Sequence, residues 1–199
     1  YLSRAGWQAQ EPVALEVRLP VDFDWRQARA AHRLPVEAWT ALGVLQAEGT
    51  ALPAVKGRAA IVLPQGWQGP AFMVFDNFDV VMQWNRSVNY ALTVAQLAHQ
   101  LVGGSALSRA GEAGALSSAQ LKAMQQALNE MGFNAGTVDG MLGPRTQTAI
   151  RLYQAMNQLP VDGYPAPSVL AHIEQTYAEA AAAGKLTLGP PPTFADPVE

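Results

Sequence analysis

Two similar glycine-containing segments in the last third of the chain restrict its fold more than any other feature. Val138-Asp139-Gly140 and Val161-Asp162-Gly163 each precede a proline, Pro144 or Pro167, that can open a helix. Glycine permits a tight turn, and an aspartate side chain can accept backbone N–H groups in an Asx-type turn. The two segments therefore predict two similar turns, each of which leads into a helix.

The residues around these turns complete a three-helix pattern. Ser117 and Gln120 have the spacing of a capping box, and Gly132 is a stop signal for the helix that they open. The second helix follows the first turn, and the third is expected from about Pro167 through Ile173. The apolar stripes are Leu121, Met124, Leu128 and Met131 on the first helix, and Ala149, Ile150, Tyr153 and Met156 on the second. A small all-helical domain is therefore predicted from Ser117 onward.

The composition excludes several classes of function. The chain has 199 residues, of which 15% are charged, and a formal net charge of −3. This balance gives no basic stripe for nucleic acid and argues against an anionic membrane surface as the partner. With no cysteine, disulfides and thiolate metal sites are excluded. His32, His99 and His172 are isolated and lack metal-site spacing, so neither a metal nor a cofactor is expected.

Short apolar segments bounded by Pro and Gly predict a mostly β first half. Strands are expected at residues 14–19, 59–63 and 71–75. Asp76-Asn77 follows the third strand and precedes the apolar run 78–82. Asp and Asn tolerate left-handed backbone angles, so this dipeptide favours a two-residue hairpin turn.

Helical patterns lie between and after these strands. Short helices are expected at residues 24–33 and 35–42, the second of which opens with a proline. From Ser87 to Val102 the apolar residues recur at helical spacing, with Ser87 as a cap. Tyr1 to Trp7 has the pattern of a helix end, with a glycine just past the C-terminus. The fold class is therefore α+β.

Changes in composition divide the chain into four parts. Residues 104–116 are rich in Gly, Ser and Ala without periodicity, which is typical of a linker. The sequence ends in an alanine-rich and then proline-rich stretch, which is typical of a disordered tail. The predicted division is 1–103 for the first domain, 104–116 for the linker, 117–178 for the helical domain and 179–199 for the tail.

The helical domain carries a recognisable motif. Val138 to Gln154 reads Val-Asp-Gly-x-x-Gly-Pro-x-Thr-x-x-Ala-Ile-x-x-Tyr-Gln, and Leu159-Pro160-Val161-Asp162-Gly163 follows. This run resembles the peptidoglycan-binding domain found at the ends of many cell-wall hydrolases, over about residues 117–177. The resemblance implies a three-helix domain that binds peptidoglycan. The motif residues are expected to build the fold and not to contact the ligand.

A second resemblance lies in the first domain. Gly69 to Phe78, followed by Trp84-Asn85-Arg86-Ser87-Val88-Asn89-Tyr90-Ala91, is similar to the C-terminal part of the catalytic domain of membrane-bound lytic murein transglycosylase B and its relatives, a glycoside hydrolase family 103-like group. That family commonly has Tyr-Asn-Arg-Ser-x-x-Tyr-Ala, so Trp84 replaces the first tyrosine. The resemblance implies the β-rich subdomain and returning helix of a lysozyme-like transglycosylase catalytic domain.

The same resemblance implies a substrate-binding role for three residues. Trp84, Asn85 and Tyr90 match family positions that line the substrate cleft. An asparagine can hydrogen-bond an N-acetyl group, and aromatic faces stack on sugar rings. The alternative interpretation is structural: Asn85 ends a strand, and Tyr90 is a core aromatic of the helix.

The catalytic chemistry of the family depends on one glutamate. That residue protonates the glycosidic oxygen and then assists attack by the muramic acid 6-hydroxyl, which gives a 1,6-anhydro product. In the family it lies upstream of the helix end that Tyr1 to Trp7 resembles. No catalytic residue is therefore expected within this chain.

Two functions follow from these resemblances. The first is lytic cleavage of the MurNAc-GlcNAc bonds of peptidoglycan by the parent enzyme, with this chain carrying part of the cleft and the wall-binding domain. The alternative is a non-catalytic anchoring module. The expected partners are peptidoglycan glycan strands and an N-terminal fragment of the same protein, which would cover an apolar face of the helix 87–102; nucleic acid is not expected. The expected location is the periplasm or bacterial cell envelope.

Overall fold

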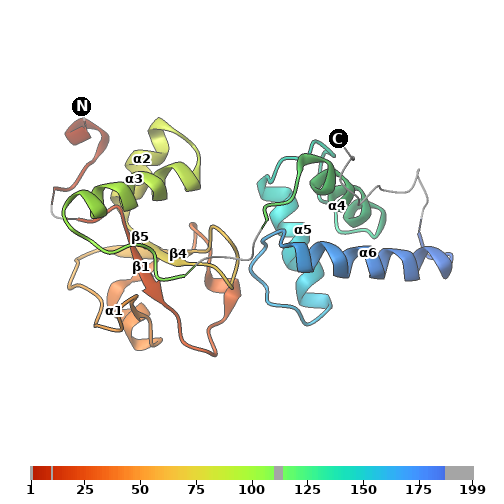
Figure 1. Cartoon of the computed structure of the whole chain (residues 1–199), viewed down its shortest axis with the longest axis horizontal. Coiled ribbons are helices and arrows are strands. Elements are labelled where there is room, and N and C mark those ends of the chain that lie inside the picture. The colour runs from red at the N-terminus through yellow and green to blue at the C-terminus, as the bar shows by residue number, and fades with distance from the viewer. Residues whose placement is uncertain (1, 10, 110–113, 187–199) are drawn as a thin grey trace. The chain divides into compact units, whose positions relative to one another are not determined.

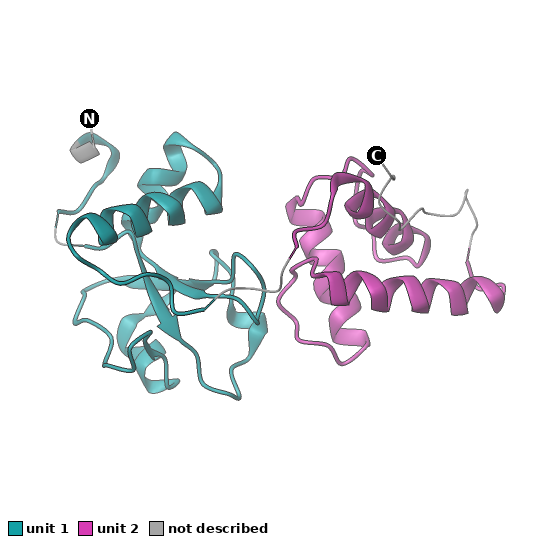
Figure 2. Ribbon diagram, viewed as in Figure 1, with its two compact units in different colours: residues 1–111 teal, residues 112–199 magenta. Residues whose placement is uncertain are grey.

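The chain forms two compact units, Tyr1–Gly111 and Glu112–Glu199 (Figure 2). The computed structural model describes residues 2–9, 11–109 and 114–186, so most of the predicted tail lies outside the described residues. The first unit combines a sheet with helices, and the second is helical, which confirms the predicted α+β class. None of the described helices is long and apolar enough to span a membrane.

An antiparallel sheet of five strands organises the first unit. Its spatial order is β2-β4-β5-β1-β3. The strands are β1 (Ala14–Arg18), β2 (Leu34–Pro35), β3 (Leu45–Gln46), β4 (Arg58–Val62) and β5 (Ala71–Val74). The three predicted strands correspond to β1, β4 and β5 and are confirmed. The edge strands β2 and β3 are too short to give a period-two pattern, so the sequence did not predict them.

Side chains that alternate along β4 and β5 build a core on each face of the sheet. Ala59, Ile61 and Met73 join a cluster with Trp39 of α1 (Val36–Ala41), whose indole N–H donates to the Ala59 carbonyl at 2.8 Å. The other face contacts α2 (Asp76–Trp84) and α3 (Val88–Leu101) through Ala60, Val62, Phe72 and Val74. Figure 1 shows α1 on one side of the sheet and α2 and α3 on the other. The sheet is therefore covered on both faces.

The predicted hairpin at Asp76-Asn77 is wrong, because helix α2 begins there. Phe75 is the extended residue before the helix, and Asp76 and Asp79 lie in its first turn. Carboxylates are favourable at a helix N-terminus. Both also bind Arg33, at 3.0 Å and 2.8 Å. Of the apolar residues that suggested a second strand, Phe78, Val81 and Met82 join the core on the α2 side of the sheet.

Other local predictions are partly confirmed. Ser87 caps α3 by accepting a hydrogen bond from the Tyr90 N–H at 3.2 Å, as expected. The helix predicted at residues 24–33 is wrong, since only the 3₁₀ turn η2 (Trp25–Gln27) forms there. Its Trp25 ring lies edge-on to Phe23 at 5.5 Å between centroids, so aromatic packing fixes this segment in place of a longer helix. The first residues form the 3₁₀ turn η1 (Leu2–Ala5), followed by Gly6 at φ 93°.

The second unit has the three predicted helices. They are α4 (Ser118–Glu130), α5 (Pro144–Met156) and α6 (Pro167–Ala182). Ser117 and Gln120 form the predicted capping box of α4. The third helix ends at Ala182, later than the predicted Ile173. Its last turns contain Tyr177, which is buried and donates a hydrogen bond to Glu130 of α4 at 2.5 Å.

Two buried glutamines hold the repeated turns in the same way. The Gln125 amide nitrogen of α4 donates to Asp139 at 3.1 Å, and its oxygen accepts from the Gly140 N–H at 2.8 Å. At the second repeated turn, the Gln154 amide nitrogen of α5 donates to Asp162 at 2.7 Å, and its oxygen accepts from the Gly163 N–H at 2.9 Å. Both aspartates also accept a backbone N–H from two residues ahead, as the predicted Asx-type turns require. The sequence repeat is therefore a repeat of side-chain contacts.

Candidate functional site

Two of the three predicted site residues line one groove in the first unit. Trp84 ends α2 and Tyr90 lies in the first turn of α3, and the bend between these helices brings both rings to a hollow of about 220 Å³. Trp84 is 71% exposed and Tyr90 is 40% exposed. Trp7, from the segment that follows η1, also lines the groove. The remaining lining residues are Ala5, Val80, Val81, Gln83 and Val94.

Asn85 is placed beside this groove but does not line it. It is exposed and has an extended backbone, and its N–H donates to the Val81 carbonyl at 3.2 Å, which ends α2. Asn85 therefore ends a helix and not a strand. Tyr90 is not a core aromatic, since Ala91 and Leu92 are the residues of this turn that are buried against the sheet.

A buried asparagine positions the third aromatic of the groove. Asn77 of α2 is fully buried, and its side chain accepts from the Gln8 N–H at 2.8 Å and donates to the Gln8 carbonyl at 2.7 Å. Its amide nitrogen also donates to the Glu11 carbonyl at 2.7 Å. These bonds fix the segment that follows Trp7 against the start of α2. Sequence reasoning missed both Trp7 and Asn77, because nothing local connects residues so far apart.

Glu11 is the buried carboxylate nearest in sequence to the groove. Burial raises the pKa of the Glu11 carboxyl, while the hydrogen bond from the Asn77 N–H, at 3.1 Å, opposes that shift. Glu11 contacts the start of α2 and is not among the residues that line the groove. Within the described part of the chain, no glutamate or aspartate lines the groove of Trp7, Trp84 and Tyr90. The groove can therefore stack and hydrogen-bond a ligand, and none of the described residues that line it carries a carboxyl group.

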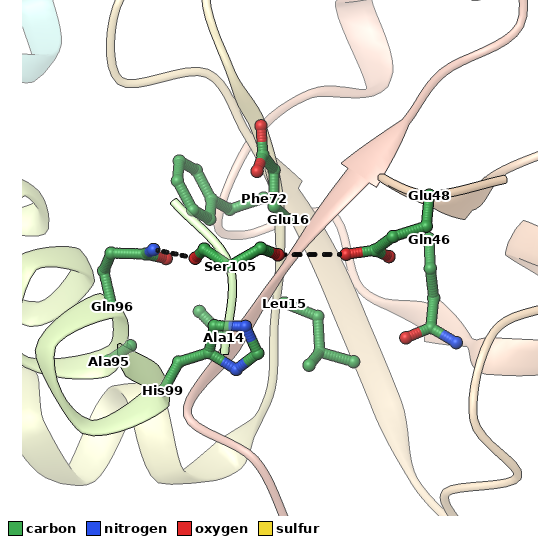
Figure 3. A pocket seen from close by; sticks show the side chains of 10 residues that line it. All are labelled: Ala14, Leu15, Glu16, Gln46, Glu48, Phe72, Ala95, Gln96, His99 and Ser105. Atoms are coloured by element: carbon green, nitrogen blue, oxygen red, sulfur yellow. Dashed lines mark hydrogen bonds between the residues drawn. The ribbon is translucent and has the colours of Figure 1, made fainter. Parts of the chain in front are cut away.

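A smaller hollow of about 50 Å³ lies between β1 and α3 (Figure 3). Ser105 lies across it: the Gln96 amide donates to the Ser105 carbonyl at 3.0 Å, and the Ser105 hydroxyl donates to Glu48 at 3.4 Å. Three residues further on, the Ser108 N–H and hydroxyl donate to Glu16 at 3.0 Å and 2.6 Å. These polar groups hold the segment after α3 against β1, so this hollow is a packing contact and not a candidate substrate site.

Two of the three histidines pack against aromatic residues. The Tyr153 hydroxyl lies 2.6 Å from His172 Nδ1, and His32 packs edge-on against Trp39 at 5.9 Å between ring centroids. Among the residues that the structure describes, no group of three or more His, Asp or Glu side chains is placed to hold a metal ion.

Comparison with known proteins assigns each unit to a family. Residues 1–99 match the transglycosylase SLT domain, and residues 117–173 match the putative peptidoglycan binding domain. Curated protein sequences give no match.

Two crystal structures of SltB3 from Pseudomonas aeruginosa are similar to the chain at 38% sequence identity. One is a complex with NAG-anhNAM-pentapeptide (TM-score 0.82), and the other is a complex with NAG-NAM-pentapeptide (TM-score 0.81). Each match covers 87% of this chain but only 48% and 47% of the SltB3 chains, so the chain spans about half the length of these structures. The predicted resemblances are confirmed at the level of domains: the chain carries a transglycosylase SLT domain over residues 1–99 and a putative peptidoglycan binding domain over residues 117–173, while the narrower resemblance to the membrane-bound, family 103-like group stays a prediction.

Proposed function

We propose that this chain is the cleft-and-anchor part of a lytic transglycosylase that cleaves MurNAc-GlcNAc bonds of peptidoglycan with a 1,6-anhydro product. One observation carries this proposal. Trp84 and Tyr90, which the family motif marks as substrate-binding, come from two helices and line one groove. They do so in a unit similar to SltB3, whose structures hold NAG-NAM and NAG-anhNAM pentapeptides.

The chemistry of the groove suits a glycan strand. Sugar rings present apolar C–H faces that stack on aromatic rings, and the groove offers Trp7, Trp84 and Tyr90. Asn85 is exposed next to Trp84, where its amide can bond an N-acetyl group at the edge of the groove. Because no carboxylate lines the groove, the proton donor for the glycosidic oxygen is not assigned to any described residue of this chain.

The second unit supplies attachment to the wall in this proposal. Its match to a peptidoglycan-binding domain supports a role in holding the enzyme on its polymeric substrate. Linking a binding module to a catalytic domain raises the local concentration of substrate at the cleft. Since peptidoglycan lies in the bacterial cell envelope, we place the protein there, in the periplasm.

An apolar stripe on α3 supports a further contact within the longer protein. Leu97 and Leu101 lie on one side of this helix and are 56% and 78% exposed. An apolar stripe at helical spacing normally packs on another element. We expect it to be covered by an N-terminal part of the same protein, as the family resemblance implies.

Ligand binding tests the cleft assignment directly. All five tryptophans lie in the first unit, and Trp84 is the most exposed of them, so its fluorescence should shift when NAG-NAM-pentapeptide is added. We expect Trp84→Ala to weaken binding, measured by titration calorimetry, about fivefold, because a stacking contact is worth roughly 0.5–1.5 kcal/mol. Leu101→Ala, exposed on α3 but outside the groove, is the control. Identical titrations for both variants would refute the assignment.

A digest of purified sacculi separates the proposal from its alternative. We expect no soluble products from this chain alone, and 1,6-anhydro-muropeptides once a fragment that supplies the upstream part of the catalytic domain is added. The alternative, a non-catalytic anchoring module, is favoured by one observation: no carboxylate is among the described residues that line the groove. It predicts sacculus binding without products in both mixtures.

A further inference from the structure

The second unit contains an open hollow of about 510 Å³ at the C-terminal end of α4. It differs in chemistry from the aromatic groove of the first unit, since no aromatic ring lines it. Its lining residues are Asn129, Gly132, Asn134, Gly136, Thr137 and Arg145. These provide one cation and several neutral polar groups, and no carboxylate is among them. We call these six residues the Arg145 hollow.

The floor of the Arg145 hollow is fixed by hydrogen bonds. Gly132, at φ 87°, ends α4, and the next residue, Phe133, donates its N–H to the Leu128 carbonyl at 2.8 Å, which makes a Schellman-type end. The Asn129 amide donates to the Gly136 carbonyl at 2.8 Å. The buried Thr146 hydroxyl donates to the neighbouring Ala135 carbonyl at 3.1 Å. The loop between α4 and the first repeated turn is therefore held in one conformation.

This loop also seats the arginine. A Cβ atom added to Gly136 would lie 3.2 Å from the Cδ atom of Arg145 and 3.3 Å from the Cβ atom of Arg145. The aliphatic part of the arginine side chain therefore packs closely over the glycine backbone. Gly136 has φ 87°, a conformation that also favours glycine. The stem is thus positioned, while the guanidinium makes no hydrogen bond or ion pair with any described residue of either unit. Its donors remain available to a ligand.

We propose that the Arg145 hollow binds a carboxylate of the peptidoglycan stem peptide, with Asn134 and Thr137 bonding the adjacent peptide groups. This rests on the proposed wall-binding role of the second unit. A guanidinium matches a carboxylate through two parallel hydrogen bonds. In peptidoglycan the free carboxylates lie on the peptide, because the lactyl carboxyl of the muramic acid is amide-linked. The lack of an aromatic ring in the hollow disfavours a sugar face as its ligand. In this proposal the first unit binds the glycan strand of peptidoglycan, and the second unit binds its stem peptide.

The test is binding of the full chain to purified sacculi, measured by pelleting over a range of protein concentrations. Arg145→Gln should weaken binding about tenfold, since a hydrogen bond to a charged group is worth roughly one decade in affinity or more. Lys122→Gln removes the same charge from an exposed position of α4 outside the hollow and should bind like the parent chain. Calorimetric melting of Arg145→Gln checks that this exposed substitution leaves the fold intact.

A soluble competitor identifies the ligand. Free stem peptide should displace the parent chain from intact sacculi, whereas the same peptide with its carboxyl groups converted to amides should not, and neither peptide should change the pelleting of Arg145→Gln. Equal binding of Arg145→Gln and the parent chain to intact sacculi would overturn the inference and leave the wall-binding role standing. An equal loss in Arg145→Gln and Lys122→Gln would overturn it as well, since net charge alone would explain it. If the parent chain does not bind sacculi, the proposed wall-binding role fails and the inference fails with it.

Discussion

Among single residues, Asn77 determines where one wall of the aromatic groove lies. Its buried side chain satisfies both backbone groups of Gln8 and the carbonyl of Glu11. Asn77→Ala leaves these groups without partners, so we expect the first unit to lose about 2–4 kcal/mol of its free energy of unfolding. Urea unfolding followed by tryptophan fluorescence measures the loss. Asn89→Ala, at an exposed position of α3, is the control and should cost less than about 0.5 kcal/mol. A loss in Asn77→Ala as small as in the control would contradict this role.

Glu11, which Asn77 also contacts, gives a pH-dependent prediction. Burial raises the pKa of its carboxyl above the ordinary value of 4.5. The folded state therefore holds this proton more tightly, and the associated stability is present below the unfolded pKa and lost as pH rises through the folded pKa. Glu11→Gln keeps an acceptor for the Asn77 N–H but carries no charge. We expect the stability of this variant, relative to the parent chain, to improve between pH 4 and pH 7.

Denaturant unfolding at both pH values measures this difference. Glu37→Gln provides the comparison, because Glu37 is exposed in the first turn of α1. Its stability relative to the parent chain should not improve over the same interval. If Glu11→Gln and the parent chain change in parallel, desolvation of this carboxyl has no measurable effect.

At the scale of elements, the first two helices of the second unit each fix the turn that follows them. Gln125 of α4 binds Asp139, Gly140, the Met141 carbonyl and Thr146. Gln125→Met keeps the side-chain volume but leaves buried polar groups unpaired. We expect a loss of about 2–4 kcal/mol, which lowers the melting temperature of this unit by about 10 °C or more.

Differential scanning calorimetry of the full chain measures this loss. Gln175→Met is the matched control, since Gln175 is exposed on α6, where its amide donates to Glu179 at 3.0 Å. The control should leave the melting temperature within about 2 °C of the parent value. Equal melting of the two variants would mean that the turn does not depend on Gln125.

The starts of the helices differ in how well they could be predicted from the sequence. Caps, prolines and glycines act within a few residues, so the capping box at Ser117 and the Pro144 helix could be predicted from sequence alone. The start of α2 at Asp76 could not, because a short apolar run fits a strand or a helix equally well. Contacts between residues far apart in the sequence favour the helix: Arg33 binds Asp76 and Asp79, and Asn77 binds Gln8.

Some residues of the candidate site could likewise be predicted from the sequence, and others could not. Trp84 and Tyr90 could be found through a contiguous family motif, and they do share a groove. Trp7 joins that groove only through the contacts of Asn77, which is 69 residues from Gln8 in sequence. Arg145 gave no sequence signal, since a single arginine after a helix-opening proline is usually solvated. Its meaning depends on the packing of its stem over Gly136.

For the whole molecule, each core belongs to one unit. The clusters around Trp39 and Phe78 contain residues of the first unit, and the cluster around Tyr153 contains residues of the second. A unit with its own hydrophobic core can fold by itself. Because all five tryptophans lie before residue 111, tryptophan fluorescence reports the first unit alone. Unfolding of the two units can therefore be followed separately in one sample.

This separation allows a direct test of where wall attachment resides. Removing residues 112–199 should leave the fluorescence-detected unfolding midpoint of the first unit within about 2 °C of its value in the full chain, because its core is retained. The same truncation should lower pelleting with sacculi at least tenfold, since the peptidoglycan-binding domain is gone. A truncated chain that is folded by fluorescence and pellets as the full chain does would move the anchoring role to the first unit, and the aromatic groove would then be the main contact with the wall.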